Sequence, residues 1–192
     1  MARPQVVSEQ DLIERLGGVF RDLGYAGASM SALAEASGLV KASLYHRFPG
    51  GKRQMAGEVL ADAGRWLADN VLSPLTRPGD PRGRLAVALD ALDTFYQAGR
   101  KGCLLNMLSS PRHEDGPFAP AVKAAIQGLV TALASVAADA GLPVAQARSR
   151  ALRSAMLLQG SLVLSRGLGS SEPFAACLAD LPDVLLGPAD RS

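Results

Sequence analysis

Side chains that can hydrogen-bond to an anion are concentrated in one short part of the sequence. Between residues 39 and 52 these side chains are Lys41, Ser43, Tyr45, His46, Arg47 and Lys52. From residue 29 to residue 53 there are four basic residues and only one acidic residue, a larger local surplus than the formal charge of +2 carried by all 192 residues. A local excess of positive charge of this kind is typical of a surface that binds a polyanion, and nucleic acid is the first candidate.

Few other residues suggest chemistry. The chain has two histidines, one of them in this basic stretch, and it lacks the H-E-x-x-H and paired-carboxylate patterns of hydrolytic enzymes. The letters RHED at residues 112–115 could ligate a metal ion, although a solvated loop is the more common reason for such a run. Cys103 and Cys177 are far apart and form no C-x-x-C pattern, which favours reduced and mostly buried thiols. We therefore predict neither an enzyme nor a metal, cofactor or disulfide.

Three helices are predicted to hold the basic stretch in place. Apolar residues recur at three- and four-residue intervals through residues 8–23, with charged residues between them, as in an amphipathic helix. Gly24 is placed as a left-handed C-cap of this helix, and Ser29 is placed to cap a short second helix. After the turn in ASGLV, a third short helix is expected over Lys41–Arg47, and the PGG at residues 49–51 ends it.

Two short helices that follow a supporting helix and are joined by a glycine-containing turn form a helix-turn-helix. The second of the two fits the major groove of DNA, which is about 12 Å wide, and its N-terminal side chains reach the base edges. With Leu44 and Phe48 turned inward, Lys41, Ala42 and Ser43 become candidates for base or backbone contacts, and Tyr45, His46 and Lys52 for phosphate contacts. Lys52 also lies in the first turn of the next helix, where free backbone N–H groups favour an anion.

Each of these features also has an ordinary structural explanation. Tyr45 alone is more often a partly buried core aromatic, His46 alone is more often a surface polar residue, and PGG alone is only a loop. Many three-helix bundles share the same spacing. The combination of features, rather than any one residue, indicates a DNA-binding element.

The remainder of the chain is predicted to be helical as well. A long fourth helix keeps an apolar rhythm from Lys52 to Leu72, where the proline-rich SPLTRPGDP interrupts it. Further helices are expected at residues 82–98, 103–108, 118–140, 144–164 and 172–186, and no segment alternates as a strand would. The fold class is therefore all-α, with about nine helices. No apolar run reaches the length of a membrane span and the N-terminus lacks a signal-peptide core, so we expect a cytoplasmic protein.

The segment GYAGASMSALAEASGLVKASLYHRFPGGK, residues 24–52, resembles the DNA-binding domain of the TetR/AcrR family of bacterial transcriptional regulators. The family pattern is matched by Gly24, Tyr25, Ser29, Ala34, Gly38, Leu39, Leu44, Tyr45, Phe48 and Lys52. One position departs from it, since Val40 stands where the family usually has a Ser or Thr that caps the recognition helix and touches a phosphate. Either Ser43 or Ser37 replaces that residue, or DNA binding is weaker. More weakly, FPGGK, KGCLLN and the C-terminal region are similar to the branch of multidrug- and flavonoid-responsive repressors.

The resemblance implies two domains and a function. Residues 1–52 would form the helix-turn-helix domain, and residues 53–192 a helical domain that binds an effector and dimerises. Base reading falls on Lys41, Ala42 and Ser43, phosphate contact on Tyr45, His46 and Lys52, and Ser29 completes the candidate DNA contacts. The implied protein is a ligand-responsive transcriptional regulator, most often a repressor released from a palindromic operator by a small hydrophobic effector. The alternative is a dimeric helical interaction or sensor protein without a specific operator.

The larger domain is expected to hold both a ligand pocket and a dimer interface. An apolar pocket for a small hydrophobic or aromatic effector would be lined by Trp66, Phe95, Tyr96, Cys103, Met107, Phe118, Met156 and Gln159, of which half could be ordinary core. A further role of Cys103 as a sensor of oxidants or electrophiles has little support, because only Arg100 and Lys101 are nearby cations.

The last two helices would build a homodimer, since two recognition helices about 34 Å apart read a palindrome. Small residues beside leucines permit close helix packing there, although such stripes are more often ordinary core; the set is Ala147, Ala151, Ser154, Ala155, Ser161, Leu158, Leu162 and Leu164, with Phe174, Leu178, Leu181 and Leu185 in the final helix. Effector binding would act on DNA affinity through the fourth helix, by moving its residues 55–72.

Overall fold

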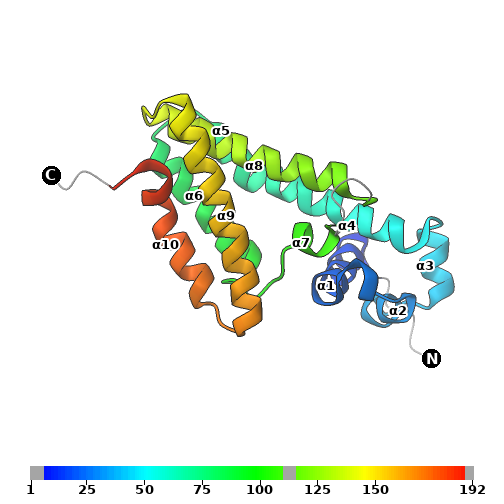
Figure 1. The fold of residues 1–192 in the computed structure, drawn as a ribbon. Helices are drawn as coiled ribbons and strands as arrows, with labels where there is room; N and C mark the ends of the chain where they lie inside the picture. Colours follow the sequence, from blue (N-terminus) through cyan, green and yellow to red (C-terminus); the bar gives the residue numbers. More distant parts are fainter. Residues whose placement is uncertain (1–6, 110–115, 189–192) are drawn as a thin grey trace. The chain divides into compact units, whose positions relative to one another are not determined.

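The computed structural model describes residues 7–109 and 116–188, and within these ranges it contains helices and no strand. The predicted all-α fold is confirmed. Nine helical runs are found, as expected, if the continuous run from Gly51 to Thr76 is taken as one (Figure 1). The elements are α1 (Glu9–Gly27), α2 (Met30–Ser37), α3 (Lys41–Arg47), α4 (Gly51–Leu67), the π-helix η1 (Ala68–Leu72), α5 (Ser73–Thr76), α6 (Pro81–Tyr96), α7 (Leu104–Leu108), α8 (Ala119–Asp139), α9 (Val144–Leu168) and α10 (Glu172–Leu186).

The chain divides into two compact units. The first consists of Met1–Gly64 and Leu104–Val122, and the second of Arg65–Cys103 and Lys123–Ser192. The chain therefore passes from one unit to the other three times, inside α4, between Cys103 and Leu104 at the start of α7, and inside α8. The domain boundary expected between residues 52 and 53 remains a prediction, while the first compact unit reaches twelve residues further and includes α7.

The first unit is built on the apolar face of α1. Ser8 caps this helix by accepting a hydrogen bond from the backbone N–H of Asp11 at 3.1 Å. The periodic leucines and phenylalanine of α1 are buried together with side chains of the next three helices; this core contains Leu12, Leu16, Phe20, Leu33, Leu44, Phe48, Met55 and Val59. Gly24 has a φ of +68°, so the backbone leaves the helical path there as expected, and one further turn follows up to Gly27.

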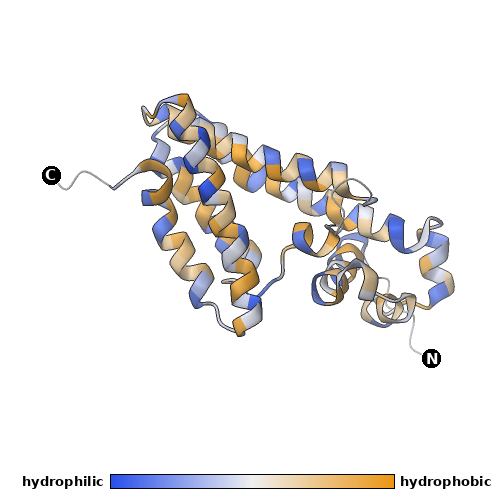
Figure 2. Cartoon of the chain, in the orientation of Figure 1, coloured by the Kyte–Doolittle hydropathy of each residue, from blue (hydrophilic) through white to orange (hydrophobic). Residues whose placement is uncertain are grey.

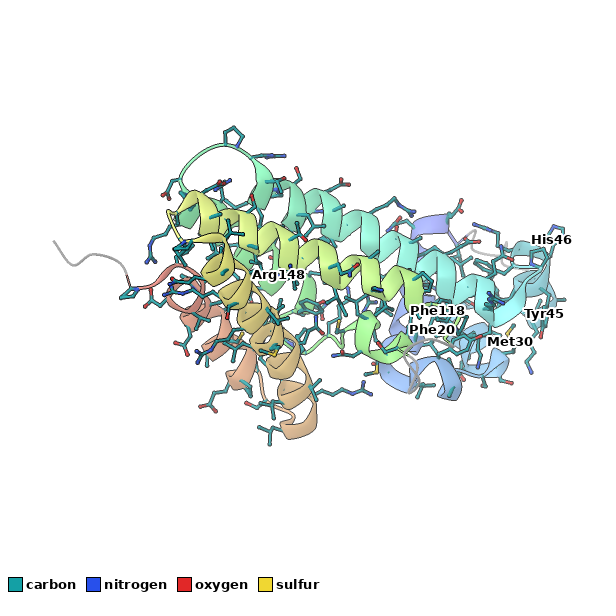
Figure 3. The ribbon with its side chains drawn as sticks, turned by 45° about the horizontal axis from the view of Figure 1, so that its top comes forward. Phe20, Met30, Tyr45, His46, Phe118 and Arg148 are labelled. Atoms are coloured by element: carbon teal, nitrogen blue, oxygen red, sulfur yellow. The ribbon has the colours of Figure 1, made fainter. Side chains whose placement is uncertain are left out.

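A segment far along the chain completes this core. Leu104 and Leu108 of α7 are buried in it, and the Phe118 ring meets the Tyr25 ring edge-on with centroids 5.1 Å apart. Figure 3 shows Phe20 and Phe118 in this part of the molecule, and Figure 2 shows that α7 is mostly hydrophobic, whereas α3 carries several hydrophilic residues. The helix-turn-helix is thus supported by residues about 80 positions downstream in the sequence.

The second unit contains closely packed α9 and α10. The small residues that were expected at a dimer interface instead face the interior of this same unit: Ala147, Ala151, Ser154, Ala155 and Ser161 are all buried, as are Leu158 and Leu162. On α10, Phe174, Leu181 and Leu185 are buried as well. That expectation was wrong for these residues, because small side chains let α9 approach its own neighbour in the chain. Leu164, by contrast, is 56% exposed.

Two arginines of α6 form ion pairs with residues near the ends of other helices in the second unit. The buried Arg84 of α6 forms an ion pair with Asp139 at the end of α8, with an N–O distance of 2.7 Å, and also donates to the carbonyl of Arg77 at 2.5 Å. Arg82 forms an ion pair with Asp183 of α10 at 3.5 Å. These contacts tie the start of α6 to the ends of two helices that are distant in sequence.

Helix α8 is long enough and apolar enough to cross a membrane, by length and composition alone, although no uninterrupted apolar run in the sequence has that length. Its buried side chains include Val122, Leu129, Ala132, Leu133, Val136 and Ala137. The core helix of a globular protein meets the same criterion, so a single helix of this kind is weak evidence for a membrane span.

Candidate nucleic-acid interface

Helix α3 presents one exposed face that contains five of the seven predicted DNA contacts. Its helical periodicity turns Leu44 inward, where this side chain and that of Phe48 are fully buried. Five further positions of the helix are exposed to solvent, namely Lys41, Ala42, Ser43, Tyr45 and His46, and Arg47 at its end is half-buried. Figure 3 shows Tyr45 and His46 pointing away from the protein at this surface, and Tyr45 is 51% exposed. An exposed tyrosine next to cationic and hydroxyl groups is suited to phosphate contact.

The turn before α3 fixes the direction of this face. Gly38 adopts a left-handed conformation with φ of +71°, and its N–H donates to the carbonyl of Glu35 at 3.1 Å. The buried Ser37 hydroxyl donates to the carbonyl of Ala34 at 2.9 Å and accepts from the N–H of Leu39 at 3.3 Å. The Ser37 hydroxyl therefore both donates and accepts a hydrogen bond inside the turn.

Val40 is the N-cap of α3 and supplies no capping hydrogen bond. Ser37 was one of two residues expected to replace the missing cap, but its hydroxyl is engaged in the turn, and no side chain caps the helix. Helix α3 thus begins without a side-chain partner for its first backbone N–H groups.

Lys52 is turned toward the protein. Its ammonium donates to the carbonyl of Tyr25 at 2.8 Å and to that of Ala26 at 3.5 Å, and it lies 4.7 Å from the centroid of the Tyr25 ring. These contacts join the start of α4 to the end of α1, and they leave the third N–H of the ammonium for another acceptor. Arg53 beside it is exposed.

Ser29 has a structural role that accounts for its residue type. Its hydroxyl accepts a hydrogen bond from the backbone N–H of Ala32 at 3.1 Å and so caps α2. The side chain is also exposed, so it can meet a phosphate from the same position.

Arg47, the last residue of α3, faces two carboxylates. It pairs with Glu9 at the start of α1 and, at 3.2 Å, with Glu58 of α4, while its guanidinium carbon lies 4.7 Å from the centroid of the Phe48 ring. The hydrogen bond to Glu9 is the main cause that raises the pKa of Arg47 above its ordinary value. The residue is therefore permanently charged.

The pairing of Arg47 with Glu9 and Glu58 was not predicted from the sequence. Glu9 is separated from Arg47 by 38 positions. The only local signal is the four-residue spacing of Gln54 and Glu58, whose side chains hydrogen-bond at 2.8 Å on one face of α4. Tyr25, on which Lys52 rests, was recognised as a motif residue but not as its partner.

The predicted effector residues do not all come together. In the second unit, Trp66 stacks on Phe95 with centroids 4.2 Å apart, Phe95 meets Tyr96 edge-on at 5.0 Å, and the Tyr96 hydroxyl lies 3.5 Å from the sulfur of Cys103. Gln159 on α9 has a buried side-chain oxygen with no hydrogen-bond partner.

The other three predicted lining residues lie elsewhere. Met156 of α9 is 60% exposed, while Met107 and Phe118 belong to the first unit, where Phe118 is part of the core. Lining by all eight residues stays a prediction. The described part of the chain contains no group of three or more potential metal ligands, and residues 112–115 lie outside it.

The chain is similar in sequence to known proteins. The family described as bacterial regulatory proteins, tetR family, matches residues 18–59. The HTH-type transcriptional regulator LmrA of Bacillus subtilis (strain 168) is 21% identical over 181 residues, which are 93% of this chain and 96% of LmrA.

Solved structures show the same fold. A TetR transcriptional regulator from Legionella pneumophila has a TM-score of 0.78 and 20% identity, with 92% of this chain and 97% of that chain covered. A cysteine mutant of the TetR-family regulator CifR, solved with a 26-base-pair double-stranded operator DNA, has a TM-score of 0.74 and 23% identity, with coverage of 94% and 98%.

Proposed function

Because residues 18–59 make this chain a member of the TetR family of bacterial regulatory proteins, and hence a DNA-binding transcriptional regulator, we propose that it is a ligand-responsive repressor. In this proposal a homodimer binds a palindromic operator, and a small hydrophobic or aromatic effector releases it. The protein acts in the cytoplasm, where its DNA is, and catalyses no reaction.

The observation that carries the proposal is the exposed face of α3. A helix with two fully buried anchors, Leu44 and Phe48, presents Lys41, Tyr45 and His46 to solvent together with the small Ala42 and Ser43. The short residues let the helix approach the groove, and the longer ones flank them and reach the backbone. The CifR relative, which has the same fold, was solved with operator DNA, and this supports operator binding as the proposed function.

A palindromic site requires two copies of α3. Helix α9 supplies a surface for the second copy, because a set of apolar side chains on it is exposed: Leu152, Met156, Leu157, Val163, Leu164 and Leu168. Several exposed apolar side chains on one helix mark an interaction surface. The proposed dimer therefore uses the outer face of α9, together with α10, in place of the small residues that are buried inside the unit.

The proposed effector binds in the second unit near the aromatic cluster of Trp66, Phe95 and Tyr96. An aromatic surface suits a mostly apolar ligand, and Gln159 of the same unit has a buried side-chain oxygen without a hydrogen-bond partner, which suits a ligand that carries a donor. Since α4 continues from this unit into the first one, a ligand that alters the path of α4 alters the spacing of the two copies of α3 and lowers operator affinity.

The test is binding of the purified protein to DNA from upstream of its own gene, measured over a series of salt concentrations. We expect tight, sequence-dependent binding with a steep salt dependence, and Tyr45→Ala should weaken it. Lys41→Ala should reduce the slope of log affinity against log salt by about 0.9 if Lys41 neutralises one phosphate. Gln127→Ala, an exposed change on α8, is the control.

Absent or salt-insensitive binding by a folded protein, on neighbouring promoters as well, would contradict the proposal and favour an interaction protein without an operator. A reporter gene under the bound promoter then distinguishes repression from activation. The single tryptophan, stacked on Phe95, gives a fluorescence signal for effector binding, and a ligand panel that changes neither this signal nor the melting temperature would contradict the effector part.

A further inference from the structure

We infer that Arg47 is a positioning residue that sets the orientation of α3 for DNA without contacting DNA itself. This inference rests on the proposed operator binding and adds a device within the same site. The guanidinium of Arg47 is held by the carboxylates of Glu9 and Glu58, which come from the two helices that flank α3 in the first unit.

Helix α3 has few other anchors. It has only seven residues and no side-chain cap at its N-terminus. Leu44 is its only buried residue, and Phe48 follows at the C-cap. Two apolar contacts on one side of so short a helix leave its rotation and tilt weakly determined, since apolar contacts are not directional. Arg47 adds directional contacts next to them, because the Nη2 of its planar guanidinium donates to carboxylates of two other helices.

The polar contacts of Arg47 extend across the site. The backbone N–H of Gly50 donates to the side-chain oxygen of Gln54 at 2.8 Å, and the amide nitrogen of Gln54 donates to Glu58 at 2.8 Å. Glu58 in turn accepts from Arg47 at 3.2 Å, and Arg47 also reaches Glu9. A continuous chain of hydrogen bonds thus links the turn after α3, the first turns of α4 and the first turn of α1.

The charge of this group argues against a phosphate contact. Two carboxylates surround one guanidinium, so Glu9, Arg47 and Glu58 together carry a net negative charge and repel a phosphate. On a helix with 3.6 residues per turn, Arg47 lies about 100° round α3 from His46 and about 120° from Lys41, so its side chain leaves the helix in a different direction from these two. A phosphate that approached Arg47 would therefore meet the two carboxylates at its Nη2.

If Arg47 and its carboxylates orient α3, removal of a carboxylate charge changes DNA affinity in the direction opposite to the one that charge alone predicts. Glu58→Gln removes a negative charge from a DNA-binding unit, which by charge alone strengthens DNA binding. If Glu58 orients α3 through Arg47, the same change weakens operator binding. We expect a loss of about three- to tenfold, the size of an ordinary pairwise coupling. Glu35→Gln, on exposed α2 and outside this network, is the matched control and should not weaken binding.

Arg47 is tested by the salt dependence of binding. Arg47→Ala should lower operator affinity by a similar factor while leaving the slope against salt unchanged, because no phosphate contact is lost. Arg47→Lys keeps the charge but not the planar guanidinium, and should bind the operator more tightly than Arg47→Ala but less tightly than the wild type. The double variant Arg47→Ala with Glu58→Gln should bind as the single Arg47 variant does, since the two residues act through one contact.

Four results distinguish the possibilities. Glu58→Gln that binds as tightly as the wild type, or more tightly, overturns the inference while the proposed operator binding stands. A fall of the salt slope by about 0.9 in Arg47→Ala would identify a direct phosphate contact and also overturn it. A wild-type protein that binds no operator overturns the proposed function and this inference together. Weakened binding by Glu58→Gln, with an unchanged melting temperature and unchanged slope, is the expected result.

Discussion

At the scale of single residues, Val40 is the N-cap of α3 but makes no capping hydrogen bond with its side chain. Its backbone, with φ of −74° and ψ of 153°, already has the extended conformation of an N-cap, but its side chain cannot accept a hydrogen bond. The side chain is 69% exposed, so little apolar burial is lost when it is replaced. Val40→Thr should therefore raise the free energy of unfolding by about 1 kcal/mol.

The measurement is urea denaturation of Val40→Thr beside Val40→Ala, which removes the same exposed side chain without adding a cap. Because α3 is the proposed recognition helix, the threonine should also strengthen operator binding. Equal stability of the threonine and alanine variants would show that a side chain at this position does not cap α3.

Lys52 and Arg53 are neighbouring cations that the structure distinguishes. Lys52 is half-buried and donates to the carbonyl of Tyr25, whereas Arg53 is exposed. Lys52→Ala should lower the free energy of unfolding by about 1 to 2 kcal/mol, since a charge-assisted hydrogen bond and a cation–π contact are lost. Arg53→Ala should change it by less than about 0.5 kcal/mol.

Thermal or urea unfolding of both variants measures this difference. It also decides how weaker DNA binding by Lys52→Ala must be interpreted, because the variant loses contacts between α1 and α4 as well as the candidate phosphate contact. Equal stability of the two variants would contradict the contacts of Lys52 with the carbonyls.

At the scale of the elements, the turn after α6 is the part of the second unit where the backbone is most restricted. Gln97 and Ala98 have φ values of 50° and 55°, and Gly99 follows with 84°. A Cβ atom on Gly99 would lie 2.7 Å from the Cβ of Phe174, in a buried position. Gly99→Ala must therefore displace α10 or strain the turn, and should cost about 2 to 4 kcal/mol.

Gly141 provides the matched control, since its φ is +91° but a Cβ there would meet nothing within 4 Å. Gly141→Ala should cost about 1 kcal/mol from its backbone conformation alone. The difference in melting temperature between the two variants isolates the steric part. If both lose the same stability, the close approach of Gly99 to Phe174 is not formed in solution.

The helices show how far the sequence determines this fold. Expected and observed bounds coincide for α3 and α10, and differ by one or two residues at both ends of α6 and α8, because glycine and proline interrupt clear helical periodicity at these places. The run after Leu72 continues through Pro74, since a proline is tolerated in the first turn of a helix.

Contacts between distant segments could not be predicted in the same way. Nothing in the sequence of α7 indicates that it packs in the first unit, and the pairing of Glu9 with Arg47 joins positions without any shared local pattern. The small residues of α9 were assigned to a dimer because composition shows that close packing is possible but not which helix is the partner. The exposed face of α3 was predictable, because periodicity alone separates Leu44 from its neighbours.

At the scale of the whole molecule, the proposed operator binding by a dimer depends on the outer face of α9. Met156 and Leu164 are exposed on it, and a Cβ built on Gly160 between them meets nothing within 4 Å, so another helix can approach closely there. A charge placed at Met156 would be buried without a partner in the dimer but left in water in a monomer. Met156→Glu should therefore shift the protein toward monomers and weaken operator binding by at least about tenfold.

Analytical ultracentrifugation over a range of concentrations measures the dimer, and Val87→Glu, which introduces the same charge at an equally exposed position on α6, is the control. The two roles considered for Met156 give different results. If Met156 forms the dimer interface, the variant dissociates and its unfolding midpoint becomes dependent on concentration. If Met156 lines the effector pocket instead, the variant stays dimeric, binds the operator normally and loses only its response to the effector, which would move the interface to another face of the chain.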